Sequence, residues 1–387
     1  MTKKGVSIPA HQHVSDFIPK KTETVIIPST NQPSFGSMFT IDIRELNVII
    51  HNLCLQFNLS AISVMTSGSY VPAQFLVDHI DYVMNGAIAY TAYPLDQFLQ
   101  AQLFQRDEDR LLMNIASGSY NSATQRQTMA SGVNSYYLPL FDFFKQAKSI
   151  PLLENAHNVQ LRIFMQPLVS STIGTGTATA SINSCNLLMN CTRLREEEAN
   201  MLRQQMYFNK ASHFKFNDLK VQSYTVNSGV SATNIVMSAI TGPISFLVFV
   251  VRPSASLTGA GEFAFTAISQ YEILNSAGQN IVGGQPISNS QALLVLGNAN
   301  TRSSYLAETA LGITNNNANV YVYSFGADCS ESASNAVGLG NYKFTGSEQL
   351  KLTFTGSLGA STQVDILAYT ESLVSFTKGS VKKSEWH

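Results

Sequence analysis

The sequence predicts an all-β protein made of two sandwich domains in tandem, with short helices in the loops and between the domains. Short apolar runs alternate with Gly, Ser, Asn and Pro along most of the chain, a texture typical of strands and turns. Several runs place apolar residues at every second position, as in a sheet with one buried face. The chain has 387 residues, 44% of them hydrophobic, which is enough for two domains of ordinary size.

Individual strands are identified by this alternation. Apolar and polar residues alternate in 159–165 and 350–355, and 364–369 begins in the same way. The run Phe246 to Val251 is different, because it is apolar on both sides. We interpret it as a strand covered on both faces, which requires a neighbour outside its own sandwich.

Two segments show helical rather than strand patterns. Residues 94–113 carry apolar side chains at helical spacing, and Pro94 suits a first helical turn. Residues 192–206 form the second predicted helix, with Thr192 as its N-cap. Glu196, Glu197 and Glu198 then lie in the first turns, where negative charge matches the helix dipole.

The second predicted helix divides the chain nearly in half. Both halves show the same order of features, with paired strands, then an interrupting segment, then further strands. We therefore expect one fold used twice. The predicted divisions are an N-terminal arm 1–21, a first sandwich 22–192, a linking helix 193–212, a second sandwich 213–381 and a C-terminal tail 382–387.

Charge excludes some classes of partner. Only 13% of residues are charged and the formal net charge is −1, so no broad basic face is expected and no sequence-specific nucleic-acid binding. Lysines pair only near the ends, for example at Lys3-Lys4 and Lys20-Lys21. These pairs could contact an anionic membrane or be solvated tails. We expect no signal peptide and no membrane-spanning run.

Catalytic, cofactor and metal sites are not predicted. The four cysteines form no C-x-x-C pair, and phosphate-loop, G-x-S-x-G and H-E-x-x-H motifs are absent. His11 and His13 have ligand spacing but lie in the arm. Asp78 and Asp81 beside His79 are interpreted as charged residues at a strand edge, and the three glutamates as helix N-terminal charges.

Several stretches, in order, resemble a known family. They are Tyr136–Phe144 followed by Ile150–Leu153 and Val159–Met165, then Thr192–Gln205, Phe216–Val226, Gly242–Val250, Val320–Phe325 with Gly340–Phe344, and finally Leu350–Phe354 and Val364–Ala368. Together they span about residues 22–381 and resemble the double jelly-roll major capsid proteins of tailless phages, adenoviruses, polintons, virophages and large nucleocytoplasmic DNA viruses. The sequence departs from the family pattern at residues 339–345, where it has Leu-Gly-Asn-Tyr-Lys-Phe-Thr and the family has Ser-Gly-x-x-Asn-Phe-Ser.

The resemblance implies a structural, non-enzymatic protein of the virion, assembled inside the host cell. It implies that two eight-stranded jelly rolls per chain form pseudo-hexameric homotrimers, which tile an icosahedral shell with neighbouring capsomers, minor capsid proteins and penton proteins. It also implies that loops 72–134 and 278–319 form an outer tower and a clasp between chains. The arm 1–21 is expected on the inner face, with possible contact to an internal membrane.

Alternative functions stay open at this point. A minor capsid or penton protein is disfavoured by the length and the mid-chain helix, and a glycoside hydrolase by the lack of a convincing carboxylate pair. A receptor- or carbohydrate-binding β-sandwich protein, such as a viral spike or a lectin, would also be rich in strands and poor in charge. The sole Trp is Trp386, at the very end of the chain, so the sequence shows no aromatic binding cluster built around tryptophan.

Overall fold

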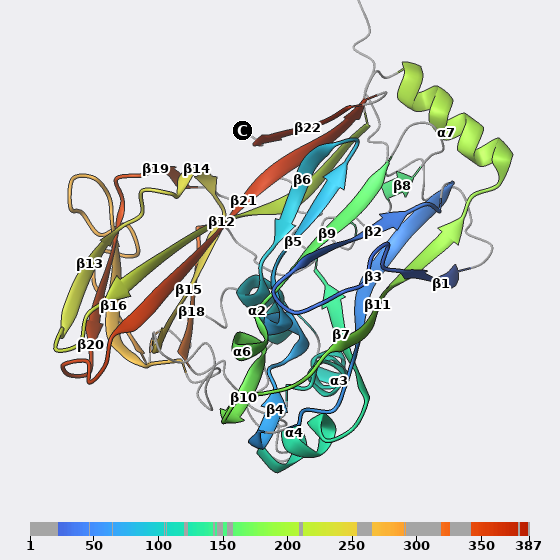
Figure 1. Cartoon of the computed structure of the whole chain (residues 1–387). Helices are drawn as coiled ribbons and strands as arrows, with labels where there is room; N and C mark the ends of the chain where they lie inside the picture. Colours follow the sequence, from blue (N-terminus) through green and yellow to red (C-terminus); the bar gives the residue numbers. More distant parts are fainter. Residues whose placement is uncertain are drawn as a thin grey trace, which may run out of the picture.

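A computed structural model describes residues 22–45, 47–63, 65–103, 105, 107–119, 123–141, 144, 150–152, 158–208, 212–253, 265–289, 291, 319–325, 342–377 and 380–385. These residues form two β-sandwiches, one from each half of the chain. In Figure 1 the first sandwich lies on the right in blue and green, and the second lies on the left in yellow to red.

The first sandwich has eight principal strands in two antiparallel sheets. These are β1 (Thr22–Pro28), β2 (Met38–Ile43), β3 (Val48–Leu59), β5 (Val77–Met84), β6 (Ala87–Ala92), β7 (Asn134–Leu140), β9 (Val159–Met165) and β11 (Ile182–Arg193). Sheet A has the order β1-β11-β3-β7, and sheet B has the order β2-β9-β5-β6. A short strand, β8 (Ile150–Leu152), pairs with β3 outside this order.

The second sandwich also has eight principal strands. These are β12 (Ser212–Val226), β13 (Ala232–Val236), β15 (Phe246–Pro253), β16 (Ile268–Leu274), β17 (Ile287–Ser288), β18 (Val320–Ser324), β20 (Gln349–Phe354) and β21 (Thr362–Thr377). Sheet C has the order β12-β21-β15-β18, and sheet D has the order β13-β20-β16-β17. The last strand, β22 (Ser380–Glu385), pairs with the C-terminal part of β21.

The strand order is the same in both sandwiches. Numbered along the chain, sheets A and C both run first, eighth, third and sixth, while sheets B and D both run second, seventh, fourth and fifth. This interleaving is that of the jelly roll, in which strands from both ends of the domain pair side by side. The expectation of one fold used twice is confirmed, and we call the two sandwiches the first and second roll.

Each roll has its own core, because alternation turns one face of every sheet inward. In β9, Val159, Leu161, Ile163 and Met165 are buried against the inner residues of sheet A. In β20, Leu350, Leu352 and Phe354 do the same in the second roll. The predicted strands 159–165 and 350–355 are therefore confirmed, the latter shifted by one residue to 349–354.

Shorter elements interrupt the rolls. Two small sheets pair β4 (Thr66–Tyr70) with β10 (Thr172–Thr175) and β14 (Thr241–Ile244) with β19 (Tyr342–Thr345). The helices are η1 (Ala73–Leu76), α2 (Pro94–Leu103), α3 (Asp107–Ser117), α4 (Ala123–Ala130), α6 (Leu168–Ser171) and α7 (Glu196–Phe208). None of these described helices is long and apolar enough to span a membrane.

The single helix expected over 94–113 is wrong, because two helices, α2 and α3, occupy this region. Leu95, Phe98 and Leu99 of α2 are buried toward the second roll, whereas α3 packs against β7 of the first. The two halves of the predicted helix therefore have different partners. The tower loop expected over 72–134 is also too wide, since β5 and β6 within it belong to sheet B.

The N-terminus of the mid-chain helix also differs from expectation. Thr192 is in β11, where it pairs with Thr22 and Ile49 and lies 2.8 Å from His51 Nε2. Arg195 takes the N-cap position instead, because its carbonyl accepts from the N–H of Ala199 and its own N–H donates to Glu198. Residues 382–385, expected in the tail, belong to β22 because their backbone pairs with β21.

Helix α3 ends in a turn that requires glycine. The N–H of Gly118 donates to the carbonyl of Ile115, and the N–H of Ser119 donates to that of Asn114, which is the Schellman arrangement. Gly118 has φ +78°, and a Cβ built there would lie 2.6 Å from the ring of Tyr136 in β7. The missing side chain thus lets the helix end approach the sheet.

Replacing this glycine should destabilise the first roll. Gly118→Ala combines a left-handed backbone with an overlap on buried Tyr136, so we expect a loss of about 2–4 kcal/mol in unfolding free energy. The control is Gly229→Ala, where φ is +83° but nothing lies within 4 Å, with an expected loss of about 1–2 kcal/mol. Urea unfolding followed by circular dichroism measures both, and equal losses would contradict the packing role.

Candidate functional site

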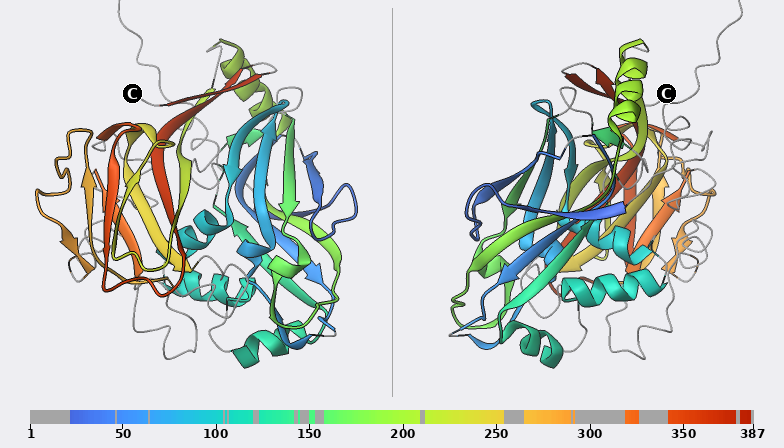
Figure 2. Two further views of the ribbon diagram at one scale, coloured as in Figure 1. Left: turned by 60° about the vertical axis from the view of Figure 1, so that its left-hand side comes forward. Right: turned by 90° about the vertical axis from the view of Figure 1, so that its right-hand side faces the viewer.

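The two rolls meet at an apolar junction between α2 and the outer face of sheet C (Figures 1 and 2). We define the junction by its buried side chains. They are Leu95, Phe98 and Leu99 from α2, Phe246, Val248 and Val250 from β15, Val320 and Val322 from β18, Leu367 and Tyr369 from β21, and Phe265. Each such side chain contributes roughly 2 kcal/mol relative to exposure, so the junction fixes how the rolls are placed.

Strand β15 is buried on both of its faces. Leu247, Phe249 and Val251 face the core of the second roll, whereas the alternate residues face the junction. The strand at 246–251 that was predicted to be covered on both sides is therefore confirmed. The neighbour outside its sandwich is a helix of the first roll.

A buried carboxylate lies within this apolar junction. Asp96 of α2 is 1% exposed, and its Oδ1 accepts a 2.6 Å hydrogen bond from the hydroxyl of Tyr369 in the second roll. Tyr90, Gln97 and Gln100 donate longer bonds of 3.4 Å. Burial raises the pKa of Asp96 to about 6, and the four donors oppose a further rise because they stabilise the charged form.

Helix α2 is itself held by the first roll. The side-chain oxygen of Gln97 accepts from the N–H of Phe141 at 2.7 Å, and its nitrogen donates to the Phe141 carbonyl at 3.1 Å. The side-chain amide thus makes the same two hydrogen bonds with Phe141 that a neighbouring strand would make, and these bonds fix the position of α2 on the first roll. Asp96, the next residue, is thereby presented to Tyr369.

A second contact joins the rolls beyond α2. Tyr90 of β6 lies edge-on to Phe216 of β12, with ring centroids 6.1 Å apart. Phe216 and Val374 are buried in the same cluster as the core of the first roll. Lys383 of β22 pairs with Asp218 at 2.6 Å and lies over the Phe216 ring. The first roll therefore meets sheet C through its β6 side.

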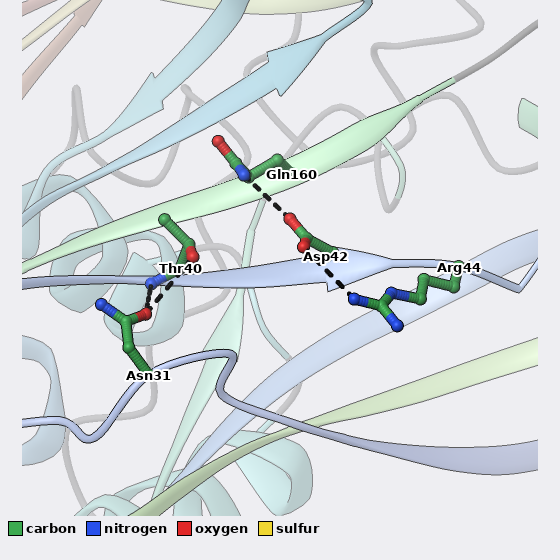
Figure 3. A network of polar contacts seen from close by, with 5 residues as sticks. All are labelled: Asn31, Thr40, Asp42, Arg44 and Gln160. Atoms are coloured by element: carbon green, nitrogen blue, oxygen red, sulfur yellow. Dashed lines mark hydrogen bonds and ion pairs between the residues drawn. The ribbon is translucent and has the colours of Figure 1, made fainter.

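The outer face of sheet B carries a polar network near its β2 edge (Figure 3). Asn31 Oδ1 accepts from the N–H and the hydroxyl of Thr40, and Gln160 donates to Asp42 at 2.8 Å. Arg44 lies 3.9 Å from Asp42. Because the pairs are partly exposed, they add little stability, and they instead keep an edge strand hydrated.

The residues considered as an acid/base pair have separate partners. His79 pairs with exposed Asp78 at 2.8 Å and stacks on the ring of Phe164. Asp81 instead accepts from the hydroxyl of Thr91 at 2.7 Å. Both aspartates are in β5 of sheet B. Asp78 also accepts from Gln166 at 2.9 Å, and Asp81 is bound by Thr91 of the neighbouring strand β6.

The structure places most of the other groups weighed from the sequence. Glu196, Glu197 and Glu198 lie in the first turn of α7, as predicted. Cys54, Cys185 and Cys191 are free thiols in the described chain, and burial raises the pKa of each. No three His, Cys, Asp or Glu side chains among the described residues are placed to hold a metal ion. His11 and His13 lie outside the described residues.

Sequence reasoning missed Asp96, although a signal was present. An acidic residue between Leu95 and Phe98 lies next to the apolar stripe of its helix, a position at which a carboxylate becomes buried when the helix is covered. The helical pattern of 94–113 alone assigns this residue no role. Its partner Tyr369 is 273 residues away, so no local pattern could identify the pair.

The raised pKa of Asp96 predicts that stability falls as pH rises. Between about pH 4 and 6 the folded chain holds a proton on Asp96 that the unfolded chain has released. The contribution of this group to the unfolding free energy is therefore fully present below pH 4 and lost above pH 6. The shift of the Asp96 pKa from 3.8 to about 6 corresponds to a loss of about 3 kcal/mol in unfolding free energy across this range. Urea unfolding at pH 4, 5, 6 and 7 measures it.

A matched pair of variants separates Asp96 from other acids. Asp96→Asn should remove this pH slope, whereas Glu197→Gln, at an exposed acid of α7, should leave it unchanged. A slope that survives in Asp96→Asn would assign the pH dependence to other groups.

No protein-family model matches the chain, and no curated protein matches it by sequence. Solved structures do match. VP54 of the virus PBCV-1 superposes with a TM-score of 0.67 at 15% identity, covering 95% of this chain and 97% of that one. The Faustovirus major capsid protein gives 0.65 at 9% identity, covering 92% and 90%. The mavirus major capsid protein gives 0.54 at 13% identity, covering 100% and 93%.

Each alignment extends over both rolls and the helix between them, because it covers at least nine tenths of both chains. At such low identities the likeness establishes the architecture. The shared strand order of sheets A to D and the matches along the full length lead to one conclusion: this chain has the double jelly-roll fold of these viral major capsid proteins.

Proposed function

We propose that the chain is the major capsid protein of an icosahedral virus. The observation that carries this proposal is the repeated eight-strand order in two rolls joined by a fixed junction. Solved chains with this architecture are described as virus capsid and major capsid proteins. The proposed role is structural, with the virion as its location, and it requires no catalytic residue.

The two rolls explain how such a chain can tile a shell. Within the chain, one side of the first roll contacts the outer face of sheet C in the second, so the contact is head to tail. Head-to-tail contacts close into a ring when the rotation between units is right. Three chains with two similar rolls each then make a homotrimer of six-sided outline that neighbouring capsomers can surround.

The divisions proposed for the chain follow the same logic. With the ends adjusted to the observed strands, residues 22–193 and 212–385 are the two rolls, the segment with α7 is the link, and 1–21 is an arm toward the inside of the particle. Minor capsid proteins, penton proteins or an internal membrane would be its partners there. The rival reading, a receptor- or carbohydrate-binding protein, has less support because the likeness to capsid proteins covers both rolls.

Trimer formation is the first test of this function. Sedimentation equilibrium of the purified chain should give about 127 kDa, three times the 42.2 kDa chain mass. The mass should stay at this value on dilution through the micromolar range, as for an obligate interface. A chain that remains a monomer at high concentration would rule the proposal out.

Removal of the arm tests its separate role. Deleting residues 2–21 should lower the yield of assembled particles without changing the sedimentation of the trimer, because the arm is proposed to act between the shell and its interior. Electron microscopy of particles and sedimentation of the soluble chain are measured in parallel. Normal particle yield from the deleted chain would contradict the role of the arm.

A further inference from the structure

Asp96 is a buried carboxylate for which the proposed structural role has no use. It lies where α2 of the first roll meets sheet C of the second roll. Among the described residues, four side chains donate hydrogen bonds to it, three from the first roll and one from the second. Both rolls therefore bind the same ionisable group.

The donor from the second roll is the strongest of the four. The Tyr369 hydroxyl donates to Asp96 Oδ1 at 2.6 Å, whereas the three bonds from the first roll are each 3.4 Å long. The Tyr369 ring stacks on Phe246 of β15, with ring centroids 4.2 Å apart, and this contact fixes its direction. Burial raises the pKa of Tyr369 well above its usual value, so the hydroxyl keeps its proton. A short hydroxyl bond to a charged carboxylate is about twice as strong as a neutral one.

Few ionisable groups face Asp96. They are Tyr90 from β6 and Tyr369 from β21, and both are buried. Strands β15 and β18 contribute apolar side chains, and η1, which packs on α2, has no ionisable residue. From β5, Asp78 and Asp81 have partners of their own on the outer face of sheet B. Asp96 is thus surrounded by neutral groups.

No basic side chain among the described residues balances the charge of Asp96. Further along sheet C, Lys383 pairs with Asp218 at 2.6 Å and not with Asp96. Helix α3, the next element after α2, begins with the charged residues 107–110. Release of the proton from Asp96 therefore leaves a negative charge in an apolar junction, where hydrogen bonds stabilise it.

A second contact between the rolls can serve as a hinge for the junction. Phe216 of β12 and Val374 of β21 are buried with the core of the first roll, and we call this the hinge contact. Because each roll also has a core of its own, α2 and sheet C can separate while both rolls stay folded. Water would then hydrate Asp96, and water stabilises a carboxylate better than an apolar junction does. Opening of the junction is therefore coupled to loss of the proton.

We propose that Asp96 and Tyr369 form a proton-controlled latch between the two rolls. With its proton, Asp96 is neutral and the junction is held most firmly. Without the proton, the junction opens more often about the hinge contact, although the closed form stays the major one. Because the pKa of Asp96 is raised to about 6 by burial, opening should increase as pH rises through this value. The latch acts within one chain, so it does not depend on assembly into a shell.

Thiol labelling at two adjacent residues tests the latch. Val250 faces the junction, Val251 faces the core of the second roll, and both are fully buried. Val250→Cys and Val251→Cys each place a thiol of similar size at one of these positions. Opening of the junction exposes only the thiol at 250, whereas unfolding of the second roll exposes either one. Labelling by N-ethylmaleimide is measured by mass spectrometry, and each rate is divided by that of a free thiol at the same pH.

The corrected labelling rates decide between local opening and unfolding. At each pH, the thiol at position 250 should react at least about tenfold faster than the thiol at 251, because opening needs no unfolding. The rate at 250 should rise roughly tenfold from pH 5 to pH 7, and adding Asp96→Asn should remove this rise. Equal rates at the two positions would overturn the latch, as would a rise that survives Asp96→Asn.

A second pair of variants tests the hydrogen bond between the rolls. In the Val250→Cys background, Tyr369→Phe should speed labelling roughly tenfold at pH 7, where Asp96 is charged, and much less at pH 5. The control, Tyr271→Phe, removes a buried hydroxyl from the core of the second roll and should leave the rate unchanged. Circular dichroism checks the folding of every variant. If Asp96→Asn fails to fold, Tyr369→Phe decides alone, and an equal effect at both pH values contradicts the latch.

Discussion

The arrangement of the whole molecule depends on covering one sheet on both sides. Strand β15 has apolar residues at every position from Phe246 to Val251, so sheet C cannot leave its outer face in water. A helix from the other half of the chain supplies the cover. Gln97 fixes that helix to the first roll, and Tyr369 meets the neighbouring Asp96. The placement of the two rolls follows from these few contacts.

The two rolls repeat one strand order but differ in what their equivalent faces present. Sheet C is apolar outward and closed within the chain, while sheet A has amides and hydroxyls outward. A contact within a polypeptide forms once and is permanent, so it can be dry. Sequence divergence between the halves is therefore expected where their surroundings differ.

Much of this architecture could be predicted from local sequence. Alternation identified the strands at 159–165 and 350–355, and the continuous apolar run at 246–251 predicted a neighbour beyond its own sheet. Local patterns failed where a distant contact decides the outcome. Thr192 looks like a cap, but pairing with two strands keeps it in β11. The break between α2 and α3 and the burial of Asp96 both depend on the second roll or on β7, which no short window contains.

The order of the two rolls along the chain has a consequence for biosynthesis. A ribosome completes the first roll, with α2 already anchored by Gln97, before it makes the strands of sheet C. The apolar surface of the nascent second roll thus emerges beside a finished template that can receive it. Because translation runs from the N- to the C-terminus, the first roll acts as an intramolecular chaperone for the second roll. The reverse order of the two rolls along the chain would not allow this.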